Sequence, residues 1–427
     1  MSNMIYGVTD SPKKVREWIL YALQQVLAVF VATVLIANIC GTPVDACLIG
    51  ACLGTLLYQV ITKFRSPMFI SSCGATVSAV IGALAISESG QNYLAVAIGG
   101  LVIFVVYAVA ALIVKFKGIA SLNKILPPII IGPITMVIGL NLATFIPTYV
   151  QVNGQHSNIG LGIAFIVMIF IAVTSHYFKG FWKTIPFLLG LILGYIISII
   201  LTVTNVAPLV DFSVFNNLHV FAVPNFTCLH WTFDISWSDV GRIVLLFVPV
   251  ALAAVCEHWA DHRTLSNIIG TDLTETPGLH RTLLGDGAAS FLGTIVCGLP
   301  NTSYGESIAT TGFSRVASTK VITLSALILG SLGFIQPVQA VIASIPSCVF
   351  GGCAMILYGF IAASGLKALI NSKADLENNK NLIIISVVLT IGVSGIWLFH
   401  ESFAGVSLAM ISGILLNIIL RPQKNKE

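Results

Sequence analysis

The chain has 427 residues, of which 56% are hydrophobic and only 9% are charged. Soluble domains carry about 25% charged residues, so a water-soluble fold of this size could not cover its surface with so few charges. The composition therefore excludes an ordinary soluble protein and indicates a chain that lies mostly in lipid. The formal net charge of +4 is small, and the positions of the charges are more informative than their sum.

The N-terminal residues 1–16 are polar, and an apolar stretch of membrane-spanning length begins at Trp18. No small-residue cleavage site follows a short hydrophobic core, so we expect a retained first helix rather than a cleaved signal peptide. The nine cysteines are scattered, mostly within apolar runs, and form no CxxC pair. This spacing favours small core residues over metal ligands, and we expect neither a metal nor a cofactor.

A bilayer core of about 30 Å requires about 20 apolar residues in a helix. Applied along the chain, this length predicts fourteen membrane segments. The first seven are Trp18–Ile39, Val44–Ile61, Pro67–Ile86, Tyr93–Val114, Ile125–Phe145, Ile159–Phe178 and Ile185–Val203. After a polar connection, Thr204–Gly241, the other seven are Ile243–Asp261, Thr282–Leu299, Asn301–Phe313, Val321–Ile335, Ala340–Ala363, Leu382–Phe399 and Phe403–Leu420.

The third and tenth segments differ from the others because they are polar and rich in glycine and small hydroxyl residues. The third reads Ser-Ser-Cys-Gly-Ala-Thr over residues 71–76, and the tenth reads Asn-Thr-Ser-Tyr-Gly-Glu-Ser over residues 301–307. Interrupted segments at corresponding places in two halves are typical of a transporter's binding site. Because each half has an odd number of segments, the second half would enter the membrane from the opposite side, which predicts an inverted repeat.

The basic residues test this topology independently. With fourteen segments and both termini inside, every lysine and arginine except Arg242 falls in an inner segment. Positive residues concentrate on the cytoplasmic side of membrane proteins. We therefore expect a multi-pass protein of the cytoplasmic (inner) membrane with both termini in the cytoplasm.

Four acidic residues lie in or near the predicted segments: Glu257, Asp261, Asp286 and Glu306. A carboxylate within the membrane is costly and is a functional candidate by default. Without a cationic partner, burial favours the protonated form of such a group. A carboxyl group that gains and loses its proton is what a proton-coupled carrier needs.

Glu257 and Asp261 are four residues apart in the eighth segment and would share one helix face. Glu257 is the deeper of the two and is the stronger functional candidate. Asp261 either joins it in proton transfer or, with His262, marks the end of the helix near the cytoplasm. His258 points away from this face, which favours a packed or interfacial residue.

Glu306 follows Gly305 and precedes a return to apolar helical character, so it would lie near the start of a half-helix. Free backbone N–H groups and the helix dipole favour an anion or a carbonyl oxygen at such a position. Gly305 would allow a ligand to approach the backbone closely. The alternative is that Glu306 only caps the half-helix, which is compatible with binding.

Three further polar residues stand in apolar surroundings. Asp286, one turn into the ninth segment, is interpreted as structural. Gln24 and Gln25 lie in the first segment, where a side-chain amide can either bridge neighbouring helices or orient Glu257 or Glu306.

The run Asn-Thr-Ser-Tyr-Gly-Glu at residues 301–306 resembles the bacterial uracil permeases of the nucleobase–ascorbate transporter (nucleobase:cation symporter) family. The resemblance covers essentially the whole chain. Its other parts are Glu257–His258, Pro-Gly-Leu-His-Arg at 277–281, Gly351–Gly352, Tyr358–Gly359 and Ala-Ser-Gly at 363–365.

The resemblance implies an all-α polytopic fold of fourteen transmembrane segments in a seven-plus-seven inverted repeat. The third and tenth segments would each be a short strand plus a half-helix that meet at the substrate. A core domain would comprise residues 1–124 and 242–336. A gate domain would comprise residues 125–241, including the outer connection, and 337–427, and would form the contact of a homodimer.

The resemblance also implies the function, which is proton-coupled uptake of uracil by an alternating-access transporter rather than an enzyme. In uracil permeases the glutamates that match Glu257 and Glu306 hold the pyrimidine. The implied substrate-binding residues are Glu257, Glu306, Gly305, Cys73, Ser72 and Tyr304, and those implied in proton coupling are Glu257, Asp261, Glu306 and Gln25. Carboxylates can accept from the two N–H groups of uracil, and backbone amides can donate to its two carbonyl oxygens.

The sequence departs from the pattern of uracil permeases at several positions. Cys73 stands where an aromatic residue is common, and Asp261 stands where a histidine is common but where other branches, including purine carriers, have aspartate. Ser307 and Ala309 replace the usual Asn and Gly. Glu306 favours the uracil permeases, because purine-type members generally carry glutamine at this position. A purine or xanthine permease of the same family therefore remains an alternative.

Two further classes are weaker alternatives. An anion carrier of the same overall fold is disfavoured because a site with Glu257 and Glu306 would repel anions. A membrane enzyme or a passive channel is also possible, and the channel would show downhill flux without proton movement.

Overall fold

The computed structural model describes residues 4–86, 91–119, 121, 127–152, 155–216, 218–372, 374–398 and 400–420. This part of the chain is mainly helical and includes three short two-stranded sheets. Among the described helices, eight are long and apolar enough to cross a membrane by length and composition. The predicted domain boundary at residues 124 and 125 lies outside the described residues.

The first half ends at α9, and a connection with two short 3₁₀ turns follows it. The elements of the first half are α1 (Val15–Cys40), α2 (Val44–Ile61), β1 (Ile70–Ser72), η1 (Gly74–Thr76), α3 (Val77–Leu84), α4 (Tyr93–Lys117), α6 (Pro128–Ala143), α7 (Ile146–Tyr149), β2 (Gln151–Val152), β3 (Gln155–His156), α8 (Asn158–Tyr177), η2 (Gly180–Thr184) and α9 (Pro186–Val203). The connection contains η3 (Phe212–Phe215) and η4 (Thr227–His230).

The second half repeats this order of long helices around a strand and a half-helix. Its elements are α10 (Trp237–Ile269), η5 (Thr274–Gly278), α11 (Leu279–Cys297), β4 (Asn301–Ser303), α12 (Gly305–Ser314), α13 (Thr319–Leu332), α14 (Gln336–Ser344), α15 (Ser347–Asn371), α16 (Asn379–Ser394), β5 (Trp397–Leu398), β6 (His400–Ala404) and α17 (Val406–Ile419). Each predicted segment contains at least one of these helices. The third and tenth are each a strand followed by a short helix, as predicted, and the fold is a seven-plus-seven inverted repeat.

Strands β1 and β4 bring the two interrupted segments together. They pair antiparallel, with Ser71 opposite Thr302 and Ser72 opposite Asn301, and all of their residues are buried. Irregular backbone at membrane depth is tolerated only where protein surrounds it. Neighbouring helices provide these contacts: Thr55 of α2 donates to the Ile70 carbonyl oxygen at 2.8 Å, and the Asn301 amide donates to the Gly50 carbonyl oxygen at 2.9 Å.

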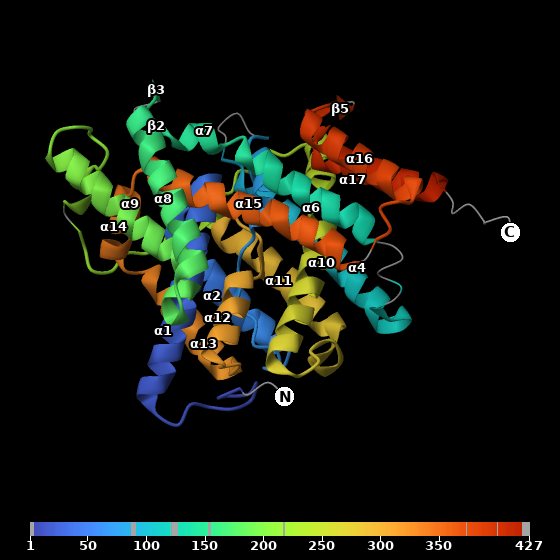
Figure 1. Ribbon diagram of the computed structural model, residues 1–427, viewed down its shortest axis with the longest axis horizontal. Helices are drawn as coiled ribbons and strands as arrows, with labels where there is room; N and C mark the ends of the chain where they lie inside the picture. Colours follow the sequence, from blue (N-terminus) through green and yellow to red (C-terminus); the bar gives the residue numbers. More distant parts are fainter. Residues whose placement is uncertain are drawn as a thin grey trace.

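The helices pack in two groups (Figure 1). In one group, α4 and α2 pack on α11, α13 packs on α1 and α2, and α10 packs on α4. In the other, α6 and α8 pack on α15, α16 packs on α6 and α17, and α9 packs on α8. Figure 1 shows α15, α6, α16 and α17 alongside one another in the upper part of the molecule, with α1, α12 and α13 below them.

Glycines permit the closest of these helix contacts. A Cβ atom on Gly100 of α4 would lie 1.9 Å from Thr294 Oγ1 of α11, and one on Gly365 of α15 would lie 2.4 Å from the Gly132 carbonyl oxygen of α6. Lipid supplies no hydrophobic driving force between helices, so close backbone approach at small residues stabilises their association. The glycines therefore set the spacing within both groups.

The eighth predicted segment is too short at both ends. Helix α10 begins at Trp237, after an N-cap at Ser236 whose hydroxyl accepts from the Asp239 N–H at 3.2 Å. A prediction based on hydropathy leaves out the polar residues at the two ends of this helix, although these residues are compatible with helix formation. The predicted connection therefore ends at Ser236 rather than at Gly241, and the predicted domain boundary after Gly241 falls inside one helix.

The twelfth predicted segment, Ala340–Ala363, is wrong as a single helix. It is divided into α14 and α15 by Ile345 and Pro346, and Ile345 is extended with a ψ of 123°. Proline has no N–H to donate and disfavours helical backbone at the preceding residue. The chain therefore starts a new helix just after Pro346.

The predicted bounds of the thirteenth and fourteenth segments also differ from the observed ones. Helix α16 ends at Ser394 before Gly395, which has a φ of 69°, and α17 begins only at Val406. Apolar residues of the intervening β5 and β6 were assigned to helices because a short apolar run does not distinguish a strand from a helix. Phe399, the predicted end of the thirteenth segment, lies outside the described residues.

Candidate substrate-binding site

A cavity of about 440 Å³ lies where the two interrupted segments face the second helix group. One wall is formed by the ends of β1 and β4 and the starts of η1 and α12, and the opposite wall by the start of α9 and by α15. Small-molecule sites commonly have volumes of about 300–1,000 Å³. The cavity is therefore large enough for a small planar ligand.

The two glutamates singled out from the sequence both line this cavity. Glu257 comes from the middle of α10 and Glu306 from the first turn of α12, and both side chains are half-buried. Among the described residues, no protein group donates a hydrogen bond to the Glu257 carboxylate and no lysine or arginine pairs with either glutamate. Both side chains can therefore receive hydrogen bonds from a ligand.

The other four predicted binding residues also line the cavity. Ser72, Cys73, Tyr304 and Gly305 lie where the strands end and the half-helices begin. The Ser72 hydroxyl is buried and has no hydrogen-bond partner among the described residues, so it is available to a ligand. Gly305 is exposed, and no atom lies within 4 Å of the position that a Cβ would occupy there. The structure thus brings together all six predicted substrate-binding residues.

Asp261 lies beside this cavity rather than in its wall. It is half-buried, and its carboxylate accepts a hydrogen bond from the Ser303 hydroxyl at 3.0 Å. Since α10 continues to Ile269, Asp261 does not mark the end of the helix, and that alternative is wrong. Asp261 is instead connected to β4 through Ser303, which itself lines the cavity.

A buried network lies behind β4 and joins three helices. The Asp286 carboxyl group of α11 lies 2.6 Å from His258 Nδ1 and accepts from the Thr302 hydroxyl at 3.1 Å, and the side chains of Asp286 and His258 are fully buried. The ring centroids of His262 and His258 are 4.0 Å apart, and His262 Nε2 lies 2.7 Å from the Tyr58 hydroxyl oxygen. The sequence interpretation of Asp286 as structural and of His258 as packed agrees with this arrangement, although it missed that the two pair.

Gln25 bridges helices and does not line the cavity. Its side-chain amide donates to the Thr311 hydroxyl of α12 at 3.1 Å and to the Ser307 carbonyl oxygen at 3.4 Å. Of the two alternatives for this residue, the helix-bridging one therefore describes its contacts. It connects α1 to the half-helix that carries Glu306.

Sequence reasoning missed the residues of the opposite wall. Phe187 of α9 and Phe360 of α15 line the cavity, and their rings meet edge to face with centroids 6.3 Å apart. An aromatic residue in an apolar segment cannot be distinguished from a lipid-facing one by its local sequence. The exposed Lys183 also lies in the lining.

Sequence comparisons agree with the motif resemblance. The profile of a family described as "Permease family" matches residues 16–401. The chain is 36% identical to the uracil permease of Bacillus subtilis (strain 168), across 99% of this chain and 96% of that protein. It is 33% identical to the uracil permease of Escherichia coli (strain K12), across 99% and 95% of the two chains.

The fold is similar to that of a solved transporter with low sequence identity. The transmembrane domain of a cyanobacterial bicarbonate transporter, BicA, superposes with a TM-score of 0.62 at 15% identity and covers 95% of this chain and 98% of that one. At this identity the similarity concerns the fold alone. The profile match and the full-length relatives, together with the motif at residues 301–306, place this multi-pass membrane protein in the permease family of nucleobase transporters.

Proposed function

We propose that this protein takes up uracil together with protons across the cytoplasmic membrane. The observation that carries the proposal is the cavity in which Glu257 and Glu306 face the paired starts of two half-helices. The relatives in Bacillus subtilis and Escherichia coli are uracil permeases, which supports the choice of substrate. The site offers carboxylates for the two N–H groups of a pyrimidine and backbone N–H groups at Gly305 and near Cys73 for its carbonyl oxygens.

The aromatic wall completes the proposed pocket. Cys73 replaces an aromatic residue that is common in uracil permeases, and Phe187 and Phe360 lie across the same cavity. A flat base could pack against these rings while the glutamates bind its edge. Phe187 and Phe360 in the opposite wall would then provide the ring contact with the base that Cys73 does not provide.

The two helix groups suggest how access alternates. The group around α11 carries the strands, and we assign it to a core domain that corresponds to the predicted ranges 1–124 and 242–336, with the second range starting at Trp237 as the helix requires. The group around α15 forms the gate domain, and we expect it also to form the homodimer contact. Because the cavity lies between the groups, movement of one against the other would open it to either side of the membrane.

Uptake into proteoliposomes tests this function. With an imposed inward proton gradient, we expect radiolabelled uracil to accumulate above the external concentration, and a protonophore should abolish the accumulation. Excess unlabelled xanthine, thymine and cytosine would define the substrate range. Uptake that only equilibrates uracil would contradict proton coupling, and accumulation of xanthine in place of uracil would favour the purine branch.

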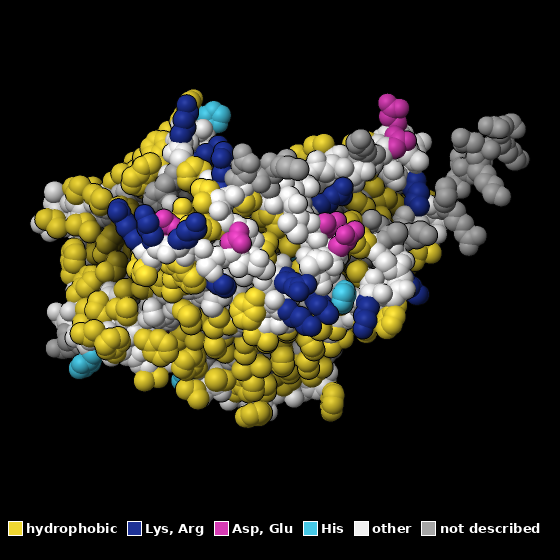
Figure 2. Space-filling model, turned by 90° about the horizontal axis from the view of Figure 1, so that it is seen from below, with side chains coloured by type: hydrophobic (Ala, Val, Ile, Leu, Met, Phe, Trp, Pro, Cys, Tyr) yellow, Lys and Arg dark blue, Asp and Glu magenta, His cyan; other side chains and the backbone are white. Residues whose placement is uncertain are grey.

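Orientation can be tested with a natural cysteine. Cys228 lies in the connection after α9 and is exposed, whereas the other eight cysteines are buried or half-buried. The proposed topology places this connection outside the cell, and Figure 2 shows lysine and arginine side chains gathered on the face seen from below in Figure 1. An impermeant maleimide should therefore label intact wild-type cells but not cells with Cys228→Ser.

An inner site provides the complementary measurement. Lys367 is exposed near the end of α15. A Lys367→Cys substitution in the Cys228→Ser background should react only after permeabilisation. Labelling of this cysteine in intact cells would reverse the proposed orientation.

A further inference from the structure

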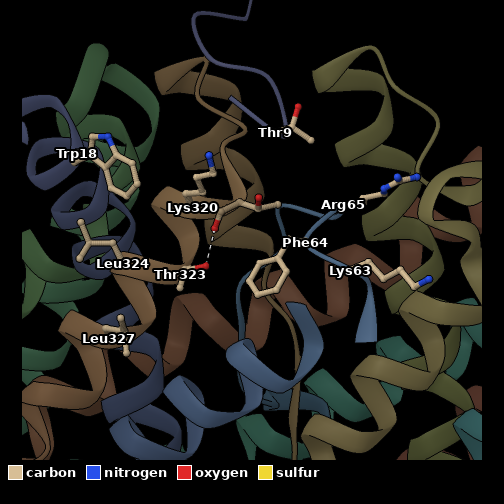
Figure 3. A pocket seen from close by; sticks show the side chains of 10 residues that line it. Thr9, Trp18, Lys63, Phe64, Arg65, Lys320, Thr323, Leu324 and Leu327 are labelled. Atoms are coloured by element: carbon tan, nitrogen blue, oxygen red, sulfur yellow. Dashed lines mark hydrogen bonds between the residues drawn. The ribbon is translucent and has the colours of Figure 1, made fainter. Parts of the chain in front are cut away.

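A second cavity, of about 550 Å³, lies at one end of the core group and shares no lining residue with the carboxylate site. It is formed by the start of α1, the turn after α2 and the start of α13. Figure 3 shows the residues around it. The proposed topology places this end of the three helices at the cytoplasmic surface of the membrane.

The charged side chains in the lining are all basic. Lys63, Arg65 and Lys320 line the cavity, and its lining includes no acidic residue. Lys320 Nζ donates to the Ser11 hydroxyl at 2.6 Å, which leaves its remaining N–H groups available. In Figure 3, Lys320 lies on one side of the Phe64 ring, and Lys63 and Arg65 lie on the other. The cavity therefore attracts an anionic group.

The rest of the lining is apolar. Leu324 and Leu327 follow Lys320 along one face of α13, and Leu327 is 50% exposed. Trp18 of α1 lies beside them, and its indole N–H donates to the Pro12 carbonyl oxygen at 2.7 Å. Tryptophan is enriched at the boundary between hydrocarbon and headgroups. The lining thus changes from cationic to apolar along the direction in which a lipid would lie.

An unusual turn presents Phe64 to this cavity. Lys63 and Phe64 both have left-handed backbone, with φ values of 56° and 54°. Non-glycine residues rarely adopt this conformation, and it occurs more often at ligand-binding sites than elsewhere. The turn is closed by a hydrogen bond from the Phe64 N–H to the Gln59 carbonyl oxygen at 2.7 Å, and Phe64 remains 43% exposed.

We propose that this cavity binds an anionic phospholipid of the inner leaflet. The phosphate lies at the basic end of the cavity, which Lys63, Arg65 and Lys320 line, and an acyl chain runs along Leu324 and Leu327. The apolar wall favours a lipid over a free phosphate ion, which would leave that surface uncovered. Because the cavity joins α1, α2 and α13, the bound lipid would stabilise the core group without entering the substrate site.

Lipid binding to the full-length protein in detergent tests this site. We would measure the thermal unfolding midpoint with added phosphatidylglycerol, phosphatidylcholine or inorganic phosphate. In the wild type, phosphatidylglycerol should raise the midpoint by several degrees, and the other two additives should have little effect. An equal shift with inorganic phosphate would show that a free anion is bound, and an equal shift with phosphatidylcholine would show that the charge is irrelevant. Either result would overturn the proposal.

Matched variants locate the effect. The triple variant Lys63→Gln, Arg65→Gln, Lys320→Gln should bind phosphatidylglycerol on the order of 100-fold more weakly, since each basic residue near the membrane surface contributes about a factor of five. The control Lys115→Gln, Lys117→Gln, Lys367→Gln removes the same charge at other helix ends and should retain wild-type binding. If both triple variants lose phosphatidylglycerol binding equally, the binding depends on the overall surface charge, and the proposed site is wrong.

A crosslinking measurement avoids dependence on a folded variant. A photoactivatable phosphatidylglycerol should label wild-type peptides from residues 319–332, and labelling should decrease with excess unlabelled phosphatidylglycerol but not with phosphatidylcholine. Crosslinks confined to other helices would overturn the assignment.

Discussion

Glu257→Gln and Glu306→Gln should each reduce uracil accumulation to background while the protein remains folded in the membrane. Both side chains line one cavity, and no lysine or arginine among the described residues pairs with either. Glutamine preserves the shape of the side chain but removes its titratable proton and half of its acceptor capacity. Loss of a hydrogen bond to a charged group weakens an interaction by about 1.5–3 kcal/mol, or about 10- to 100-fold in affinity.

Uptake and binding should be measured together on these variants. We expect purified Glu257→Gln and Glu306→Gln proteins to bind uracil at least about tenfold more weakly than the wild type. Glu275→Gln is a matched control, because Glu275 is an exposed glutamate in η5 that does not line the cavity. Wild-type uptake by either site variant would refute the assignment. A similar loss in Glu275→Gln would indicate a general effect on folding or expression.

Asp261→Asn should separate uracil binding from proton coupling. Asp261 lies one helical turn, about 5.4 Å, from Glu257 along α10 and is not part of the cavity lining. Two carboxyl groups this close disfavour joint ionisation, so a single proton can be shared between them. Asparagine keeps an oxygen that can accept from Ser303 but cannot take up a proton. Equilibrium binding should therefore stay within about threefold of wild type, a difference of well under 1 kcal/mol, while gradient-driven accumulation is lost.

Ser303→Ala provides the control for this prediction. It removes the 3.0 Å hydrogen bond to Asp261 but leaves the carboxyl group in place. If Asp261 acts through its proton, Ser303→Ala should still accumulate uracil against its gradient. If Asp261 serves to hold β4 in place through this hydrogen bond, Ser303→Ala should lose uracil binding. Asp261→Asn, which keeps the acceptor oxygen, should then retain both binding and accumulation, and the coupling role would be wrong. Binding to purified protein and uptake in vesicles distinguish these outcomes.

Hydropathy and charge patterns are sufficient to predict the membrane class, the approximate positions of the fourteen segments and the candidate site residues. The length of each apolar stretch and the distribution of basic residues are sufficient to predict the segments. The bilayer has nearly the same thickness for every segment, and basic residues concentrate on its cytoplasmic side. Glu257 and Glu306 were found for the same reason, since a carboxylate in an apolar segment is exceptional wherever it occurs. The polar runs at 71–76 and 301–307 indicated the two interrupted segments, and the resemblance to uracil permeases implied a strand and a half-helix in each.

Other features depended on contacts between residues that are distant in sequence. The helix ends at Ser236, Pro346 and Gly395 depend on capping and backbone geometry. A mean hydropathy over a window of about 20 residues does not detect these local features. The pairing of His258 with Asp286 could not be inferred, because which buried groups meet depends on the packing of α10 against α11. The placement of Phe187 and Phe360 in the same cavity as the two glutamates could not be predicted, because an aromatic side chain has the same hydropathy whether it contacts lipid, the protein core or a ligand.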